Sequence, residues 1–226
     1  QFIFLPDLSF LIKYGWDPHF SRAASTFFDP NFLGSFLIII LLVLTTVKDK
    51  KIFYALFAFF YITLLTTFSR GAYLAFLVGF MTFATLNKSY WWGIATIFLF
   101  LILILSFTNY QTEVAEPRNI DRTQSAKARL DTWQQGLTIF KSQPILGVGF
   151  NAYRYAIREY SLGDEEFLNS HGSTTNDSSL LYVAATTGFI GLVSYLFFLA
   201  ILTGQKNILL TASLTGLLAQ SFFANT

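Results

Sequence analysis

Long stretches without any charged side chain constrain the fold of this sequence more than any other feature. Six such stretches approach the roughly 20 apolar residues that a helix needs to cross the hydrocarbon core of a membrane. They cover residues 31–47, 52–68, 71–86, 90–107, 178–203 and 208–223. Each stretch is continuously apolar and does not alternate with polar residues, so the pattern predicts helices and not barrel strands. We therefore expect an all-α fold, a polytopic bundle of transmembrane helices.

The charged residues are few and unevenly placed. They make up 12% of the chain, against roughly 25% in average soluble domains, while 54% of the residues are hydrophobic. Most of them lie within residues 111–166, as expected for one aqueous loop in a membrane protein. The chain begins with Gln1 inside an apolar stretch, so we expect a piece of a longer protein.

The sequence predicts no metal site and no cofactor. It contains no cysteine, which excludes disulfides and thiolate metal ligands. Its two histidines, His19 and His171, do not show a zinc-binding spacing. The expected spans also lack ionisable residues in their interiors, which argues against an ion-coupled transporter, because transporters usually need such groups near the midplane.

Lysines in three short loops predict the orientation in the membrane. Between the expected spans lie Lys48, Lys50 and Lys51, then Lys88, then Lys206. Alternation puts these loops on one side, which the positive-inside rule makes cytoplasmic. We expect three regions: residues 1–107 with an N-terminal extracytoplasmic segment and transmembrane helices, residues 108–175 as a helical extracytoplasmic loop, and residues 176–226 as two further transmembrane helices.

The long loop is expected to fold into two amphipathic helices. The first has an apolar stripe at helical spacing and ends near Pro144, and the second repeats this spacing. The two stripes consist of Leu130, Trp133, Leu137 and Phe140, and of Phe150, Tyr153, Ile157 and Tyr160. We expect both helices to lie on the membrane surface with their apolar faces toward it, as a lid over the outer face of the bundle.

Arginines at the extracytoplasmic boundary are candidates for anion binding. Arg70 occupies a two-residue turn between two spans. There it either reaches the lipid headgroups or holds a phosphate through forked hydrogen bonds. Arg129 lies one helical turn before Trp133, whose ring could orient it, although a solvated helix face is the alternative. Arg22 precedes the first full span, where Asp29-Pro30-Asn31 predicts a helix start.

Further candidates come from the end of the loop. Arg154 and Arg158 are one turn apart on the second helix, where a solvated face is the simpler interpretation. His171 lies in the polar string NSHGSTTNDSSLL, where it could take a proton from a hydroxyl, although a lone loop histidine is more often inert. Asn176, Asp177 and Ser178 are residue types that cap the start of a helix.

The order of these motifs resembles the C-terminal half of the O-antigen ligase and polymerase superfamily. The resemblance runs from RAASTFFDPN through FSRGAYLAFLVGF and PILGVGFNAY to His171 and NDSSLLYVAATTGFIGL, about residues 22–198. It implies a multi-pass protein of the bacterial cytoplasmic membrane with its active site on the extracytoplasmic side. It also implies metal-independent transfer of a glycan from an undecaprenyl-diphosphate carrier to a hydroxyl of a glycan, lipid or protein acceptor, with no nucleic acid as a partner.

The resemblance also implies roles for individual residues. His171 and Arg129 match the family's catalytic residues, and Arg70 and Arg22 match arginines that would bind the diphosphate. Arg154 and Arg158 are further candidates for the same role. The sequence departs from the family in one place, where His and Asn are usually adjacent. Here four residues separate His171 from Asn176, so Asp177 or Asn176 is an alternative base or orienting group.

Two other functions stay open from the sequence. A polysaccharide or lipid-carrier transporter would use the same kind of bundle, and midplane charges or broken helices would favour it. A membrane scaffold with a partner-binding loop would leave the loop arginines dispensable. Neither the sugar, the acceptor nor the choice between ligase and polymerase follows from the sequence.

Overall fold

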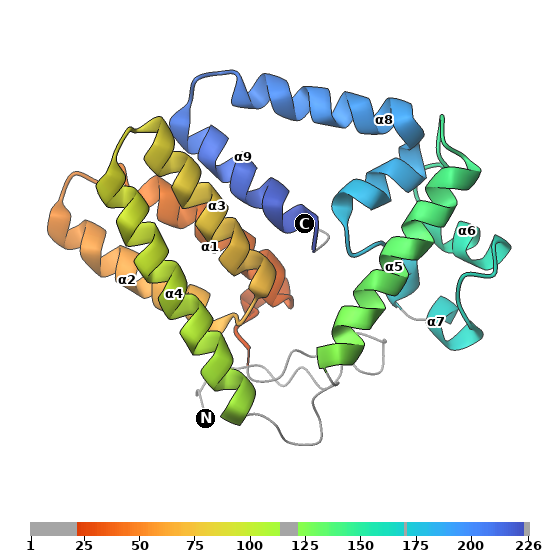
Figure 1. The fold of residues 1–226 in the computed structure, drawn as a ribbon, viewed down its shortest axis with the longest axis horizontal. Coiled ribbons are helices and arrows are strands. Elements are labelled where there is room, and N and C mark those ends of the chain that lie inside the picture. The colour runs from red at the N-terminus through yellow and green to blue at the C-terminus, as the bar shows by residue number, and fades with distance from the viewer. Residues whose placement is uncertain (1–21, 114–121, 170, 224–226) are drawn as a thin grey trace.

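The computed structural model describes residues 22–113, 122–169 and 171–223, and all regular structure in these ranges is helical (Figure 1). Five helices form a bundle, and a second group of helices from the long loop lies beside it (Figure 1). The bundle consists of α1 (Pro30–Leu44), α2 (Lys50–Thr66), α3 (Arg70–Leu86), α4 (Tyr90–Glu113) and α9 (Ile208–Ser221), preceded by η2 (Ser25–Phe27). The loop group consists of α5 (Arg122–Ser142), α6 (Tyr153–Glu159), α7 (Glu165–Asn169), η3 (His171–Thr174) and the first part of α8 (Ser179–Thr203).

Side-chain caps begin most of the apolar helices where the sequence places polar residues. Asp29, Asp49, Ser69, Ser178 and Asn207 each accept a hydrogen bond from the first turn of the helix that follows. These caps satisfy backbone N–H groups that have no partner within the helix. The predicted helix start at the first of these residues is therefore confirmed.

Helix α3 is the centre of the bundle because small residues let its neighbours approach closely. It packs most extensively on α9, and also on α4 and α1. A Cβ added at Gly79 would lie 3.0 Å from the carbonyl oxygen of Ala212, and one added at Gly216 would lie 2.7 Å from that of Ala75. Only small residues at the contact allow the backbones of two helices to come this close.

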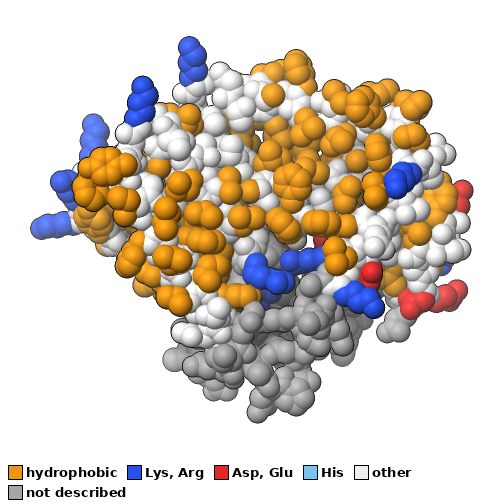
Figure 2. Space-filling model, viewed as in Figure 1, with side chains coloured by type: hydrophobic (Ala, Val, Ile, Leu, Met, Phe, Trp, Pro, Cys, Tyr) orange, Lys and Arg blue, Asp and Glu red, His pale blue; other side chains and the backbone are white. Residues whose placement is uncertain are grey.

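All six predicted spans lie on helices, but the helices differ in length. Residues Tyr90–Asn109 of α4 and all of α8 are long and apolar enough to cross a membrane, whereas α1, α3 and α9 are apolar but shorter. Large apolar side chains such as Phe59, Phe98 and Phe197 are more than 60% exposed, and they belong to a broad hydrophobic surface (Figure 2). A surface of this size favours contact with lipid.

The three short loops that carry lysines lie at the same end of the molecule. The α1–α2, α3–α4 and α8–α9 connections all lie at the upper left of Figure 1. Figure 2 shows basic side chains projecting from this end. This arrangement agrees with the predicted alternation of the spans, while the assignment of this end to the cytoplasm stays a prediction.

Helix α5 packs inside the loop group through residues outside the predicted apolar stripe. Leu130 and Leu137 of the expected stripe are 56% and 43% exposed, whereas Ile139 is fully buried. Helix α5 packs against α8 through Gly136, where an added Cβ would lie 2.7 Å from the side-chain nitrogen of Asn176. Gly136 and Ile139 thus belong to the face of α5 that packs inside the protein, while the contact of the leucine stripe with a membrane surface stays a prediction.

The second loop helix is shorter than predicted. Phe150 was expected in its apolar stripe but lies before the helix and is 88% exposed. Helix α6 begins only at Tyr153, because Asn151 adopts a left-handed backbone conformation with φ of 62°. Tyr153 and Ile157 are buried, as the spacing predicted, but they pack inside the loop group with Ile139 and not toward a membrane.

The connection between α5 and α6 is hydrogen-bonded to α8 at a break in that helix. Gly188 lies inside α8 with φ of 66° and ψ of −166°, and Gly147 in the α5–α6 connection also has a positive φ of 66°. The two backbones cross here: Val148 N–H donates to Ala185 O over 3.0 Å, and Phe189 N–H donates to Pro144 O over 2.8 Å. The segment after α5 thus supplies partners to backbone groups that the broken helix leaves free.

Candidate functional site

A cavity of about 390 Å³ lies between the bundle and the loop group. Helix α3 contributes the side of the cavity with Arg70, and α5 contributes the side with Arg129. The remaining lining residues are Gly71, Leu74, Leu130, Trp133 and Phe223. The structure therefore brings together Arg70 and Arg129, two of the residues that the sequence analysis named as candidates. In Figure 2 basic side chains lie at this place between the two groups.

Arg70 is the first residue of α3, and the preceding turn fixes its position. Ser69 caps the helix through a 3.2 Å bond from Ala72 N–H, and its hydroxyl donates to Asn31 Oδ1 at 2.6 Å. The guanidinium lies 6.0 Å from the ring centroid of Phe107. A helix N-terminus carries partial positive charge, so a cation is intrinsically disfavoured there and an anion is favoured. The arginine and the helix end together make a positive potential at the cavity.

Arg22 bonds to backbone carbonyls beside the cavity. Its Nε donates to Thr67 O over 2.9 Å, and a terminal nitrogen donates to Phe68 O over 3.4 Å. The next residue reinforces this contact, because Ala23 N–H donates to Thr66 O over 2.9 Å. These carbonyls belong to the C-terminal end of α2, where a cation is electrostatically favoured. Arg22 is therefore placed to hold the turn that presents Arg70.

Arg129 and Trp133 lie one turn apart on α5 and both line the cavity. The Trp133 ring packs on Phe223, with 5.9 Å between the ring centroids. Its indole N–H is buried and has no hydrogen-bond partner among the described residues. A buried donor without a partner typically costs about 1–3 kcal/mol. Phe223 lacks any sequence signal that would assign it to this site, because only the tertiary fold brings it to α5.

Arg154 anchors the segment that contains His171. Its Nε donates to Ser173 Oγ over 2.8 Å, and this hydroxyl donates to Leu168 O over 3.0 Å. Ser173 is fully buried, and it lies two residues after His171 in η3. The side chain of His171 itself lies outside the described part of the structure. Arg158 is exposed in the last turn of α6.

Asn176 joins three helices at the start of α8. Its side-chain nitrogen donates to Thr132 O and, over 2.8 Å, to the Tyr153 hydroxyl. Its Oδ1 accepts from Ser178 N–H over 2.9 Å. Asn176 is fully buried, and an amide does not accept a proton at neutral pH, so its place fits an orienting role and not that of a base. Burial raises the pKa of Tyr153 to about 12, so its hydroxyl stays neutral.

Asp177 connects α8 to the helix that contains Arg129. One carboxylate oxygen lies 3.0 Å from the Thr132 hydroxyl, which is also 2.9 Å from the carbonyl oxygen of Arg129. Unlike Asn176, Asp177 is only partly buried and can accept a proton. The sequence alone did not predict the contact with Thr132, because 45 residues separate the two positions.

Comparisons with known proteins give one finding. The sequence model described as O-antigen ligase matches residues 53–196, well over half of the chain. The chain therefore belongs to the O-antigen ligase family, a group of bacterial inner-membrane proteins with glycosyltransferase-like function. The matched region contains Arg70, Arg129 and His171, whereas Arg22 lies outside it. A search of curated proteins found no match to the chain.

Proposed function

We propose that this member of the O-antigen ligase family transfers a glycan from an undecaprenyl-diphosphate carrier to an acceptor hydroxyl. The cavity between the bundle and the loop group would hold the diphosphate. The observation that carries the proposal is the position of Arg70 and Arg129, which come from separate helices and line one cavity. Guanidinium groups bind phosphate oxygens through paired, charge-assisted hydrogen bonds.

The surroundings of the two arginines support an anionic ligand. Among the described residues that line the cavity there is neither Asp nor Glu. The N-terminus of α3 adds partial positive charge next to Arg70. A phosphate or sugar oxygen would also be an acceptor for the unpartnered indole N–H of Trp133, after a small movement of the ring that opens it to the cavity.

The proposed reaction is one displacement at the anomeric carbon. The acceptor oxygen forms a bond to C1 of the first sugar, while the bond from C1 to the diphosphate oxygen breaks. The electron pair leaves with undecaprenyl diphosphate, whose growing negative charge Arg70 and Arg129 would stabilise. The hydroxyl proton would pass to His171, with Asp177 as the alternative base. The proposed chemistry uses no metal ion and no cofactor.

Other candidate residues would act by positioning these groups. Arg22 would hold the turn before α3, and Arg154 would hold η3 through Ser173. Arg158 is exposed on α6, and a contact with substrate there is the least supported of the predicted roles. The site faces the extracytoplasmic side in this proposal, opposite the loops that carry lysines.

The transporter alternative has one feature in its favour, the break in α8. Broken helices in transporters expose free backbone groups to a substrate site. Here the backbone groups on both sides of Gly188 bond to the segment after α5: Gly149 N–H donates to Thr186 O over 2.9 Å, and Phe189 N–H donates to Pro144 O over 2.8 Å. The break thus holds the loop group in place, which supports the transferase proposal.

The experiment is a transfer assay with purified full-length protein and an undecaprenyl-diphosphate-linked glycan. Arg70→Ala and Arg129→Ala should each reduce the rate by about 10²–10³, the usual effect of removing one preorganised donor to a developing charge. Lys141→Ala is the matched control, because Lys141 is an exposed cation on the same helix as Arg129 and does not line the cavity.

Three outcomes distinguish the functions. Wild-type rates in both arginine variants would refute the proposed site. Movement of the lipid-linked glycan across a vesicle membrane without a covalent product would favour the transporter. A loss of at least 10² in His171→Ala, with normal donor binding, would support His171 as the base, and an equal loss in Asp177→Asn instead would assign that role to Asp177.

A further inference from the structure

An exposed apolar surface lies on the connection between α5 and α6. Ile145, Leu146 and Phe150 are 65%, 71% and 88% exposed, and we call these three residues the hairpin surface. Single exposed apolar residues are common on proteins, but a cluster of large ones indicates a binding surface. The three residues do not line the cavity described above.

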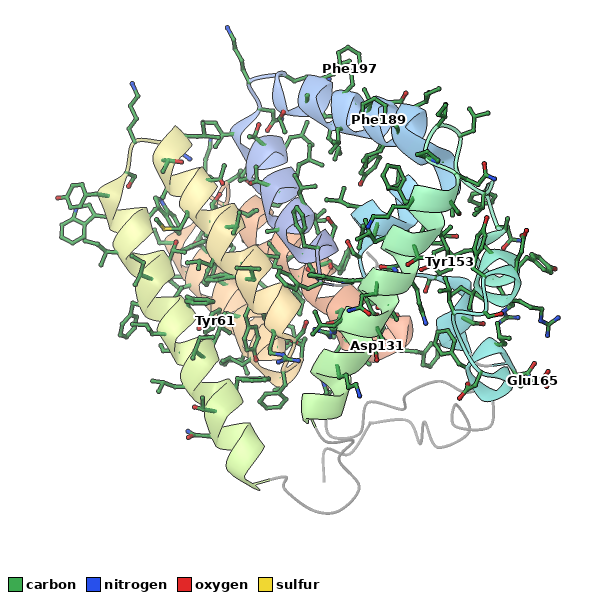
Figure 3. The ribbon with its side chains drawn as sticks, turned by 45° about the vertical axis from the view of Figure 1, so that its right-hand side comes forward. Tyr61, Asp131, Tyr153, Glu165, Phe189 and Phe197 are labelled. Carbon is green, nitrogen blue, oxygen red and sulfur yellow. The ribbon has the colours of Figure 1, made fainter. Side chains whose placement is uncertain are left out.

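The hairpin surface continues onto the apolar side of α8. Phe189 N–H donates to Pro144 O over 2.8 Å, and Ile190 N–H donates to Ile145 O over 3.4 Å, so the two chains lie side by side. Phe189 and Ile190 are themselves 62% and 54% exposed. From there exposed apolar residues continue along α8 to Phe197, and Figure 3 shows how Phe189 and Phe197 lie along this helix. Helix α8 is one of the two candidate membrane spans.

Several backbone groups of the hairpin meet the main requirement for non-helical chain within a membrane. Such chain is tolerated only where its polar groups find partners in the protein. The N–H groups of Gly147, Val148 and Gly149 all donate to backbone carbonyls over 2.9–3.0 Å. The carbonyls of Pro144 and Ile145 accept from α8. Apolar side chains therefore point outward while these backbone groups are paired inward.

The length of α8 after its break also places the hairpin near lipid. Residues 189–203 span about 22 Å at a rise of about 1.5 Å per residue, whereas a hydrocarbon core is about 30 Å thick. This straight part alone is too short to cross the core. The apolar side chains beside its first residues would extend the hydrophobic surface on the loop side.

We propose that the hairpin surface is embedded among the lipid acyl chains of the membrane leaflet on the loop side. The hairpin acts there as an anchor that fixes the depth of α5, which ends at Ser142 just before it. The inference needs α8 to span the membrane, but it does not depend on the proposed transfer reaction. Failure of either proposal therefore leaves the other standing.

The absence of cysteine from the chain allows a direct test by site-specific labelling. Single-cysteine variants Leu146→Cys and Phe150→Cys would be labelled with an environment-sensitive fluorophore in lipid nanodiscs. Glu165→Cys is the aqueous control, because Glu165 is exposed on α7, away from α8 (Figure 3). Phe197→Cys is the lipid control, because Phe197 is exposed near the middle of the part of α8 that follows Gly188.

Quenchers in the two phases give opposite expectations. Spin-labelled lipids should quench the fluorophore at positions 146 and 150 at least threefold more than at position 165, and aqueous iodide should show the reverse order. Iodide quenching at 146 and 150 equal to that at 165 would overturn the proposal. Protection from both quenchers would also overturn it, because protein and not lipid would then cover the surface.

A second measurement avoids the label. Leu146→Asp should lower the thermal midpoint in nanodiscs, because it places a charge among acyl chains. Glu165→Gln, a change of charge at an exposed position of the loop group, should leave the midpoint unchanged. If water surrounded Leu146, its replacement by Asp would have no effect on the midpoint, and that result would contradict the anchor.

Discussion

Adding a single methyl group should reduce the stability of the loop group most at the point where the backbones of Gly147 and Gly188 cross. Gly147 has φ of 66°, in the left-handed region. A Cβ added there would lie 2.6 Å from the backbone nitrogen of Gly188. The clash is with backbone, so no side-chain rotation can relieve it. We expect Gly147→Ala to separate the hairpin from α8.

Two effects set the size of the loss. The left-handed conformation costs a residue with a Cβ about 1–2 kcal/mol. Overpacking against a contact that cannot move usually costs about 1–3 kcal/mol more. Together they predict a loss of about 2–5 kcal/mol for Gly147→Ala. For a domain of this size each kcal/mol lowers the midpoint by about 2–4 °C, so the midpoint should fall by about 4–20 °C.

The assay is thermal unfolding of the purified chain, followed by the fraction that remains monodisperse after heating. Gly93→Ala is the matched control, because a Cβ at Gly93 in α4 would meet nothing within 4 Å. In a helix interior this change should be neutral or stabilising by up to about 1 kcal/mol. Equal midpoints for Gly147→Ala and the wild type would refute the role assigned to the crossing.

Two further predictions follow from the contacts around the cavity. Arg22→Gln should lower the free energy of unfolding, because it removes the hydrogen bonds to the carbonyls of Thr67 and Phe68 at the end of α2. The expected loss is about 1.5–3 kcal/mol, the usual value of charged hydrogen bonds. An unchanged thermal midpoint would contradict this prediction. Burial raises the pKa of Tyr153 from 10.0 to about 12. The unfolded chain therefore loses this proton first, so stability is fully present below pH 10 and falls by about 3 kcal/mol as pH rises to about 12. Tyr153→Phe should lose this part of the alkaline sensitivity, and midpoints measured at pH 9 and pH 11 would test it.

Sequence patterns predicted the helices well but not the faces through which the loop helices pack. The apolar runs and the cap at Asp29 mark elements through local chemistry, so their positions could be predicted. The packing face of α5 depends on Gly136 and on its contact with Asn176, a residue 40 positions later. Helical periodicity marks apolar positions such as Leu137, but it does not show where two backbones can approach.

The candidate site was predicted in part for the same reason. Arg70 was a candidate because it lies in a short turn between two apolar spans. Arg129 was a candidate because it lies one helical turn before Trp133 and matches a family residue, and both arginines line the cavity. Phe223 and the contact between Thr132 and Asp177 could not be predicted, since they depend on how α5, α8 and α9 meet. The four-residue segment GSTT separates His171 from Asn176, its expected neighbour, and this spacing alone does not fix the direction of the histidine side chain.

The helix dipole acts with opposite sign on Arg22 and on Arg70. The two arginines lie at opposite kinds of helix end, one at the carbonyls that end α2 and the other at the first residue of α3. A cation at a helix C-terminus is stabilising, so folding alone accounts for Arg22. A cation at a helix N-terminus is disfavoured by a similar amount, so the helix dipole does not account for Arg70. An anion in the cavity would reverse that sign, because it would interact favourably with both the guanidinium and the helix end. The position of Arg70 at the cavity and at a helix N-terminus thus supports the proposal that the cavity binds a negatively charged group.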